Sequence, residues 1–353
     1  MSYPVRFVIV GSGGSTAQWC RGVLPKVIAT NKAMPVAVAD ENPETLRQAQ
    51  ESLDLSAQQC FTNAAQAFDA RRADFALILA PSQHHEQLVD LALRHDLHVL
   101  IDAPLADTMP SACRVYKQVR DSDKKLAVLM AHRYDQDKQT LLRLVEAREY
   151  GTLNYVSARS LHNCRGRGTW GRLRYDMPNP ILVENAVHHF DLFRAISQSE
   201  PRIVHAVSWN PPWGDFRGDS TAIAVVEMEN GVHCVYEGAA ANAVTLNGWG
   251  KEYLRAECIN GTLELNRREL RLMRGESFEE PRIAQLPLLD QPLWANAWLV
   301  DMFCDYINDA VKAPNRLKEV FPSMALTFAA AESARTGRAV DVQAYLKEQF
   351  KAA

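Results

Sequence analysis

Short apolar runs alternate with helical patterns over residues 1–131. The runs are Arg6–Val10, Val36–Asp40, Phe75–Leu79, His98–Ile101 and Ala127–Ala131. They lack strict alternation of apolar and polar positions, which is typical of strands buried on both faces. Helix patterns lie between them over Pro43–Leu53, Glu86–His95 and Ser111–Asp121. This order predicts a doubly wound parallel sheet, an α/β domain that covers residues 1–131.

The pattern changes after residue 131. A helix over Leu141–Arg148 and a strand over Tyr155–Leu161 precede a loop rich in Gly, Arg, Asn and Pro at residues 163–180, and a helix follows at Glu184–Ile196. Strand-like segments then succeed one another at Ile203–Trp209, Thr221–Glu229, Val232–Ala240, Tyr253–Cys258 and Thr262–Leu265, and apolar helices at Trp294–Val311 and Pro322–Thr336 end the chain. Consecutive strands joined by turns predict a second domain, residues 132–353, of the α+β class with an open, mostly antiparallel sheet.

A glycine-rich turn follows the first predicted strand. It consists of Gly11, Ser12, Gly13, Gly14, Ser15 and Thr16, and a helix pattern comes next. A dinucleotide pyrophosphate binds at such a turn, because Gly11 permits the tight bend and Gly13 lets the backbone approach the phosphates. Asp40 ends the second strand, where a carboxylate binds ribose hydroxyls, and Glu41 beside it would repel the additional phosphate of NADP. We therefore expect NAD rather than NADP, although a plain turn and a helix cap remain alternative interpretations of these residues.

Composition and charge narrow the class of protein. Lys and Arg total 39 and Asp and Glu total 42, a net charge of −3, so no overall positive field attracts nucleic acid or an anionic membrane. The seven cysteines lack a Cys-x-x-Cys pair and fit neither a disulfide framework nor a zinc ribbon. No apolar stretch approaches the roughly 20 residues of a membrane helix. We expect a cytoplasmic protein that binds neither nucleic acid nor membranes.

The helix over Glu184–Ile196 carries the clearest acid and base candidates. Glu184, His188 and Asp191 are spaced to share one helical face. A carboxylate one turn away can raise the pKa of His188 and fix its tautomer, so that the free ring nitrogen accepts a hydroxyl proton near neutral pH. A hydrogen-bonded core histidine is the alternative for His188, and His189, on another face, is interpreted as structural. The Glu-x-x-x-His pair supplies only two metal ligands, with a third needed from His85, His132 or Asp191, so no metal site is expected.

Further motifs follow the third and fourth strands. They are "APSQHHE", with Pro81, Ser82 and His85, and "DAPLA", with Asp102 and Pro104. Together with the glycine-rich turn, "VADENPE", "HRYDQ", "VENAVHHFDLF" and "SARTGRAVDV", they resemble the Gfo/Idh/MocA family of nicotinamide-dependent oxidoreductases, nearly end to end. The resemblance implies a Rossmann domain, activity on sugars, cyclitols or related polyols, and a homodimer or homotetramer formed through the open sheet. It also implies that Pro81, Ser82, His85, Asp102 and Pro104 belong to the cofactor site, with Pro81, Ser82 and Pro104 at its nicotinamide end.

The chain departs from the family pattern at several positions. Ala103 stands where the family has the lysine of Glu-Lys-Pro, Asp102 replaces the Glu, and Glu184 replaces an Asp. Alanine cannot donate to a substrate oxygen, and one acid or base group contributes about 10²–10⁴ in rate. Arg133 and His132 are the candidates to substitute for the amine, with His162 after them. Two alternatives stay open, namely a redox-silent dinucleotide-binding regulatory or scaffold protein, and a lyase or hydrolase that retains its cofactor.

The loop at residues 163–180 gathers arginines around Trp170. They are Arg165, Arg167, Arg172 and Arg174. Guanidinium groups bind carboxylates and phosphates, and an indole can stack on a sugar face, so an anionic substrate such as a sugar acid is one expectation and a solvated basic loop is the other. We predict hydride transfer between NAD(H) and a carbinol carbon, with His188 as base and Glu184 orienting it. Arg133, His132, Asp191 and Trp170 are the predicted substrate contacts.

Overall fold

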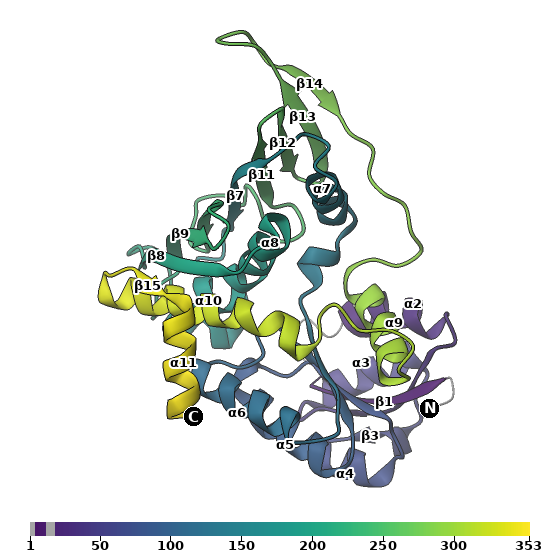
Figure 1. Ribbon diagram of the computed structural model, residues 1–353. Coiled ribbons are helices and arrows are strands. Elements are labelled where there is room, and N and C mark those ends of the chain that lie inside the picture. The colour runs from purple at the N-terminus through teal and green to yellow at the C-terminus, as the bar shows by residue number, and fades with distance from the viewer. Residues whose placement is uncertain (1–3, 12–17) are drawn as a thin grey trace. The chain divides into compact units, whose positions relative to one another are not determined.

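Two compact units make up the computed structural model, which describes residues 4–11 and 18–353 (Figure 1). The first unit comprises residues 1–131, 293–321 and 352–353, and the second comprises residues 132–292 and 322–351. The chain therefore leaves the first unit after Ala131 and returns to it at Leu293.

The first unit is built on a six-stranded parallel sheet. Its strand order is β3-β2-β1-β4-β5-β6. The bounds are β1 Val5–Val10, β2 Ala33–Ala39, β3 Cys60–Phe61, β4 Phe75–Ile78, β5 His98–Asp102 and β6 Leu126–Leu129. The sequence order reverses between β1 and β4, the place where open α/β sheets bind ligands. The predicted parallel sheet is confirmed, and the two-residue β3 is an addition to it.

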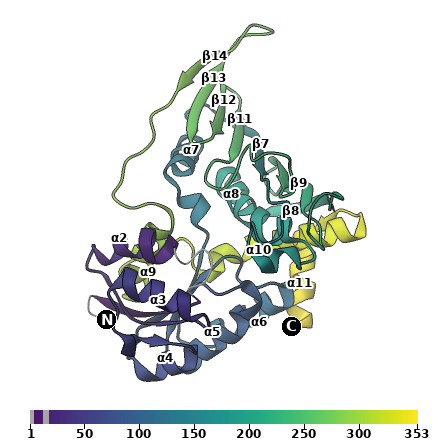
Figure 2. The same ribbon diagram turned by 180° about the vertical axis from the view of Figure 1, so that it is seen from behind.

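Helices surround this sheet (Figure 2). They are α2 Leu24–Ile28, which continues the π-helical turn Trp19–Val23, α3 Pro43–Leu53, α4 Ala64–Ala70, α5 His85–Arg94 and α6 Met109–Arg120. Local sequence explains the start of α3, because the Asn42 side chain accepts a hydrogen bond from the Glu44 amide and Pro43 follows the cap. Thr108 caps α6 in the same way, through the Ser111 amide.

The segment at residues 293–321 differs from expectation, because it packs with the first unit although the sequence placed it in the second domain. Its helix α9, Ala295–Ile307, lies against β5, β6 and α2. The ring of Phe303 meets that of Phe75 edge-on at 5.2 Å, and Lys32 Nζ lies 2.8 Å from the Asp301 carboxylate and 2.9 Å from that of Asp305. The apolar face of α9 thus finishes the core of the parallel sheet.

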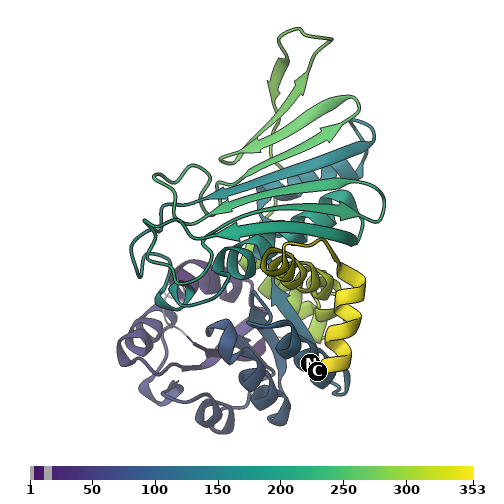
Figure 3. The same cartoon turned by 90° about the vertical axis from the view of Figure 1, so that its left-hand side faces the viewer.

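The second unit is built on a nine-stranded sheet with the order β14-β13-β12-β11-β7-β10-β9-β8-β15 (Figure 3). The bounds are β7 Leu153–Leu161, β8 Pro201–Trp209, β9 Thr221–Met228, β10 His233–Ala239, β11 Tyr253–Cys258, β12 Gly261–Asn266, β13 Glu269–Arg274, β14 Arg282–Gln285 and β15 Val340–Asp341. All neighbours are antiparallel except β7 and β10, which run parallel. The predicted open, mostly antiparallel sheet is confirmed.

Helices line the sheet of the second unit. They are α7 Gln136–Glu146, α8 Val187–Ser197 and α10 Leu317–Thr336, and α11 Val342–Ala352 follows β15 at the end of the chain. The Ala206 amide donates to the Ser333 hydroxyl at 2.9 Å, which fastens α10 to β8, and the Ser323 hydroxyl donates to Asp191 Oδ1 at 2.9 Å, which fastens α10 to α8. Within the described part of the chain, no helix is both long enough and apolar enough to cross a membrane.

Candidate functional site

The turn after β1 is tightly constrained at Gly11. Its φ is +78°, and a Cβ there would lie 2.7 Å from the Cα and N of Ala80, so only glycine fits. The Gly11 amide donates to the Ala39 carbonyl at 2.9 Å, which joins the ends of β1 and β2. The other residues predicted for the dinucleotide turn, Ser12, Gly13, Gly14, Ser15 and Thr16, lie outside the described residues.

Asp40 immediately follows β2, at the carboxyl end of the strand next to β1. Its Oδ1 accepts a hydrogen bond from the Asn42 amide at 2.8 Å, and its own amide donates to the Phe61 carbonyl at 3.1 Å. The carboxylate thus shapes the turn that precedes α3, whose N-cap is Asn42 and not Asp40. Asp40 lies at the end of β2, the position at which the ribose interpretation expects a carboxylate.

The residues predicted after β4 and β5 meet at the same sheet edge. His85 is buried, with Nε2 2.7 Å from the Ala80 carbonyl and Nδ1 3.0 Å from the Pro104 carbonyl. The peptide bond between Ala103 and Pro104 is cis, and the Ala103 amide donates to Asp102 Oδ1 at 3.0 Å. His85 therefore ties together the loops that carry Pro81 and Ser82 on one side and Pro104 on the other, which is a positioning role in this structure.

In the second unit, His188 lies at the start of α8 with only 6% of its surface exposed. Its ring centre is 4.8 Å from that of His132 and 5.0 Å from the ring of Trp249. Its Nδ1 is buried without a hydrogen-bond partner. Burial lowers the pKa of His188 to about 3, with a smaller contribution from His189, so the imidazole is neutral at physiological pH.

The expected effect of Glu184 on His188 is not found. Glu184 belongs to a π-helical turn, Ile181–Ala186, that precedes α8, and its Oε2 accepts from Arg174 Nε at 2.9 Å. The prediction that a neighbouring carboxylate raises the pKa of His188 was wrong, because desolvation dominates at this buried position. Glu184 instead connects α8 to the loop at residues 163–180.

A fully buried ammonium group lies near these histidines. Lys138 Nζ is 3.0 Å from Asp135 Oδ2, 3.3 Å from Glu252 Oε2 and 3.5 Å from Asp137 Oδ1. Burial alone would lower the pKa of Lys138, but these carboxylates outweigh it and raise that pKa. Burial alone would likewise raise the pKa of Glu252, and Lys138 is the main influence that lowers it. Lys138 and the three carboxylates therefore form a cluster of opposite charges in the interior of the second unit.

His132 and Asp191, both predicted substrate contacts, are deeply buried. Burial lowers the pKa of His132 well below its ordinary value, and its Nε2 lies 3.4 Å from Glu252 Oε1. Asp191 Oδ1 lies 3.9 Å from Arg133 Nη1 and 3.7 Å from Arg194 Nη1. The structure thus brings Arg133 to the carboxylate of Asp191, and His132 to the ring of His188.

The arginine-rich loop reaches the π-helical turn before α8 through Arg174. The guanidinium of Arg174 stands 5.3 Å from the Trp170 ring and 2.8 Å from Glu184 Oε2, and the indole stacks on the His162 ring at 6.5 Å. Arg167 pairs with Asp176. Carboxylates of the chain therefore already neutralise Arg167 and Arg174, which supports the solvated-loop interpretation for these two residues.

Sequence reasoning missed Lys138, Trp249 and Glu252. Lys138 follows two aspartates in "DQDK", and the other two belong to "GWGKE", but neither string is specific to a buried site. Trp249 and Glu252 contact the histidines, and Lys138 contacts Glu252, only when the segment before β11 and α7 assemble beside α8.

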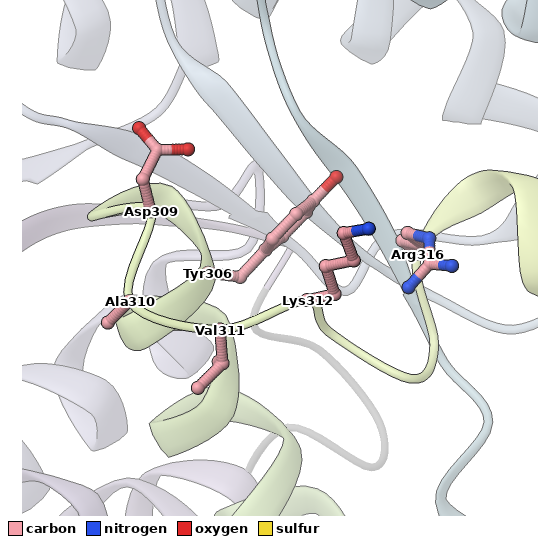
Figure 4. Close-up of a pocket in the computed structure, with 6 residues that line it drawn as sticks. All are labelled: Tyr306, Asp309, Ala310, Val311, Lys312 and Arg316. Atoms are coloured by element: carbon pink, nitrogen blue, oxygen red, sulfur yellow. The ribbon is translucent and has the colours of Figure 1, made fainter.

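A separate pocket of about 530 Å³ lies in the first unit, where the chain leaves α9 (Figure 4). Its lining residues are Tyr306, Asp309, Ala310, Val311, Lys312 and Arg316. Lys125 pairs with Asp309 and stands 4.8 Å from the Tyr306 ring. Of the predicted site residues that the structure describes, none lines this pocket.

Comparisons with known proteins give a consistent assignment. Residues 5–130 match the family described as "Oxidoreductase family, NAD-binding Rossmann fold", and residues 139–256 match the "GFO/IDH/MocA C-terminal domain". The uncharacterized protein y4oX of Sinorhizobium fredii is 38% identical over 353 residues, which cover 98% of each chain. Inositol 2-dehydrogenase of Corynebacterium glutamicum is 27% identical over 236 residues, 66% of each chain.

Among solved structures, the fold is similar to that of an oxidoreductase from Agrobacterium radiobacter in complex with NAD⁺, L-tartaric acid and magnesium. The TM-score is 0.82 at 17% identity, and the match covers 97% of this chain and 99% of that one. The two family matches lie on the parallel-sheet unit and on the open-sheet unit, as the sequence motifs predicted. The chain therefore belongs to the Gfo/Idh/MocA family of oxidoreductases, whose first domain is an NAD-binding Rossmann fold.

Proposed function

We propose that this chain catalyses reversible hydride transfer between NAD(H) and a carbinol carbon of a sugar, cyclitol or sugar acid. Membership of an oxidoreductase family supports the reaction class. The observation that carries the proposal within the chain is the buried, neutral imidazole of His188 on α8, beside the rings of His132 and Trp249.

The first unit fits a dinucleotide. Because Gly11 has no side chain, the backbone after β1 can lie close to that of Ala80. Asp40 provides a carboxylate at the end of the neighbouring strand, β2. When bound, NAD⁺ accepts a hydride and NADH donates one. Asp40 and Glu41 favour NAD over NADP, because their charges oppose an additional phosphate.

In the second unit, His188 exchanges the proton of the substrate hydroxyl. A neutral imidazole has a lone pair that accepts this proton when the alcohol is oxidised, and the imidazolium returns it when the ketone is reduced. Burial disfavours the imidazolium, so His188 passes the proton on to water and returns to its neutral form. The indole of Trp249, beside His188, offers an apolar surface. The C–H groups of a sugar or cyclitol ring can stack on such a surface.

Substitution of His188 tests its role as the proton acceptor. We expect His188→Ala to lower kcat/KM for the best substrate by about 10²–10⁴, because it removes the proton acceptor. The rate of NADH formation is measured across a panel of polyols, aldoses and sugar acids, and NADH affinity is measured in parallel by fluorescence titration. NADH affinity should not change.

His95→Asn is the matched control, since His95 also lies near a carboxylate, that of Asp69 at 3.1 Å, but on α5 of the first unit. Unchanged turnover in His188→Ala, for a substrate the wild type oxidises, would remove His188 from the mechanism. Binding of NADH with no turnover of any substrate by the wild type would favour the redox-silent alternative that Ala103 raises.

A further inference from the structure

Three buried side chains of the second unit bring potential metal ligands together. They are His132, in the short helical turn Ala131–Tyr134, His189 on α8, and Glu252, just before β11. One ligand atom from each lies within 4.8 Å of the others, and each residue is at most 2% exposed. Of the metal ligands considered from the sequence, the cluster contains only His132, and it lacks Glu184, His188, His85 and Asp191.

The tautomer of His189 leaves a ligand nitrogen available. Its Nδ1 lies 3.2 Å from the Asn185 carbonyl and donates to it, so Nε2 holds the lone pair. That Nε2 is buried, and no residue in the described part of the chain forms a hydrogen bond with it. The Tyr236 hydroxyl donates to Asn185 Oδ1 at 2.9 Å and so fixes the residue that orients the ring. Metal-binding histidines are held through their second nitrogen in this way.

His132 and Glu252 face each other at a distance that suits a shared ion. Neither ring nitrogen of His132 has a hydrogen-bond partner among residues 4–11 and 18–353, and its Nε2 lies 3.4 Å from Glu252 Oε1. Two ligands at about 2.1 Å from a tetrahedral zinc ion lie about 3.4 Å apart. Glu252 Oε1 accepts from the Gly250 amide at 2.8 Å and retains a second lone pair.

The charges around the cluster favour the binding of a cation. Buried Glu252 and Asp137 and half-buried Asp135 lie around the single ammonium of Lys138, so these four groups carry a formal charge of −2 when all are ionised. A buried excess charge is costly unless it is paired. Lys138 faces Oε2 of Glu252. A divalent cation bound at the other oxygen, Oε1, would balance this negative charge.

We propose that His132, His189 and Glu252 form a binding site for a divalent transition-metal ion of the zinc class. Two imidazoles and one carboxylate suit zinc and its first-row neighbours rather than magnesium, which prefers oxygen ligands. Three protein ligands leave a further coordination position open to water or to a substrate oxygen. His188 lies next to this site, since its ring centre is 4.8 Å from that of His132. The proposal does not depend on the hydride-transfer reaction.

The test uses the full chain without an affinity tag, stripped with EDTA and dialysed against Zn²⁺ or Co²⁺. Wild type should retain about one Zn²⁺ per chain by elemental analysis. Co²⁺ should give visible absorption bands that Zn²⁺ abolishes by displacement. His189→Asn and Glu252→Gln should weaken binding at least about tenfold, because each loses a ligand. His95→Asn, which alters an imidazole and carboxylate pair on the other unit, should bind as wild type does.

Three results would overturn the proposal. They are no saturable binding of either ion to wild type, equal binding by the ligand variants, or loss of binding in His95→Asn. Tyr236→Phe keeps every proposed metal ligand and removes only the hydroxyl that donates to Asn185. This variant therefore tests the proposal if the ligand variants do not fold. It should weaken Zn²⁺ binding severalfold, and unchanged binding would contradict the arrangement described for His189.

Discussion

Ala103 is the residue whose chemistry differs most from the family pattern. It follows β5, its amide is held by the Asp102 carboxylate at 3.0 Å, and a cis peptide bond joins it to Pro104. These contacts use only the backbone of Ala103, so its side chain is free to vary without altering them. The methyl group cannot donate a hydrogen bond or offset negative charge on a substrate oxygen.

Ala103→Lys should therefore raise kcat for alcohol oxidation, by up to about 10², because it restores an amine at the end of β5. Initial rates at saturating NAD⁺ test this, with NADH affinity as the check on cofactor binding. If affinity is normal and the rate does not rise, the missing amine does not limit this enzyme and another group has taken its place.

At the scale of the element, α9 and β5 carry contacts that stabilise the first unit. Phe303 of α9 is fully buried against Phe75 of β4, and β5 begins with His98, which is only 6% exposed. His98 Nδ1 accepts a hydrogen bond from the Lys125 amide at 2.9 Å. Both contacts link a strand of the sheet to a segment that comes later in the chain.

Phe303→Ala should destabilise the protein by about 3–5 kcal/mol, because it leaves a cavity beside the parallel sheet. The free energy of unfolding in urea measures this. Val311→Ala, at a position 38% exposed just beyond the same helix, should change it by no more than about 0.5 kcal/mol. Similar losses in the two variants would argue that α9 does not complete the core.

His98 should make stability depend on pH. Burial, with help from Lys124 and Lys125, lowers the pKa of His98 from 6.5 to about 4. The unfolded chain therefore binds a proton that the folded chain rejects, so the stabilisation is complete above about pH 6.5 and is lost as pH falls toward 4. Unfolding free energies across this range should fall more steeply for wild type than for His98→Asn. Parallel curves would contradict the shifted pKa.

Sequence patterns predicted elements whose residues are buried throughout or alternate regularly. Strands β1, β4 and β5 appear as continuous apolar runs because both faces of that sheet are covered. Strand β14 was missed because all its residues are exposed, and β3 because it has only two. His188 was predicted from its spacing and the family motif, and its role stays a prediction. Glu252 and Lys138 were not, because residues far apart in sequence meet only through the tertiary fold.

At the scale of the whole molecule, the open sheet presents apolar side chains to solvent. Val207 and Trp209 of β8 and Ile223 and Val225 of β9 are each more than 40% exposed, and Val207 pairs with Ile223 across the strands. A contiguous exposed apolar patch on a sheet is typical of an interaction surface. The family resemblance led us to expect a homodimer or homotetramer formed here.

Ile223→Glu should reduce the assembly to a smaller species, because it places a charge within the apolar patch. Light scattering coupled to size-exclusion chromatography measures the mass. Ile259→Glu, at a position 75% exposed just after β11, is the control and should leave the mass unchanged. A wild type that is monomeric at all concentrations would contradict the expectation.

The position of β7 has a consequence for biosynthesis. This strand lies between β10 and β11, and it precedes both in the sequence by some seventy residues or more. A nascent chain therefore emerges from the ribosome with β7 exposed along both edges until its distant neighbours have been translated. Such a delay exposes backbone donors and acceptors to other chains. We expect heterologous yield to depend on translation rate and chaperone supply more strongly than the stability of the finished protein would suggest.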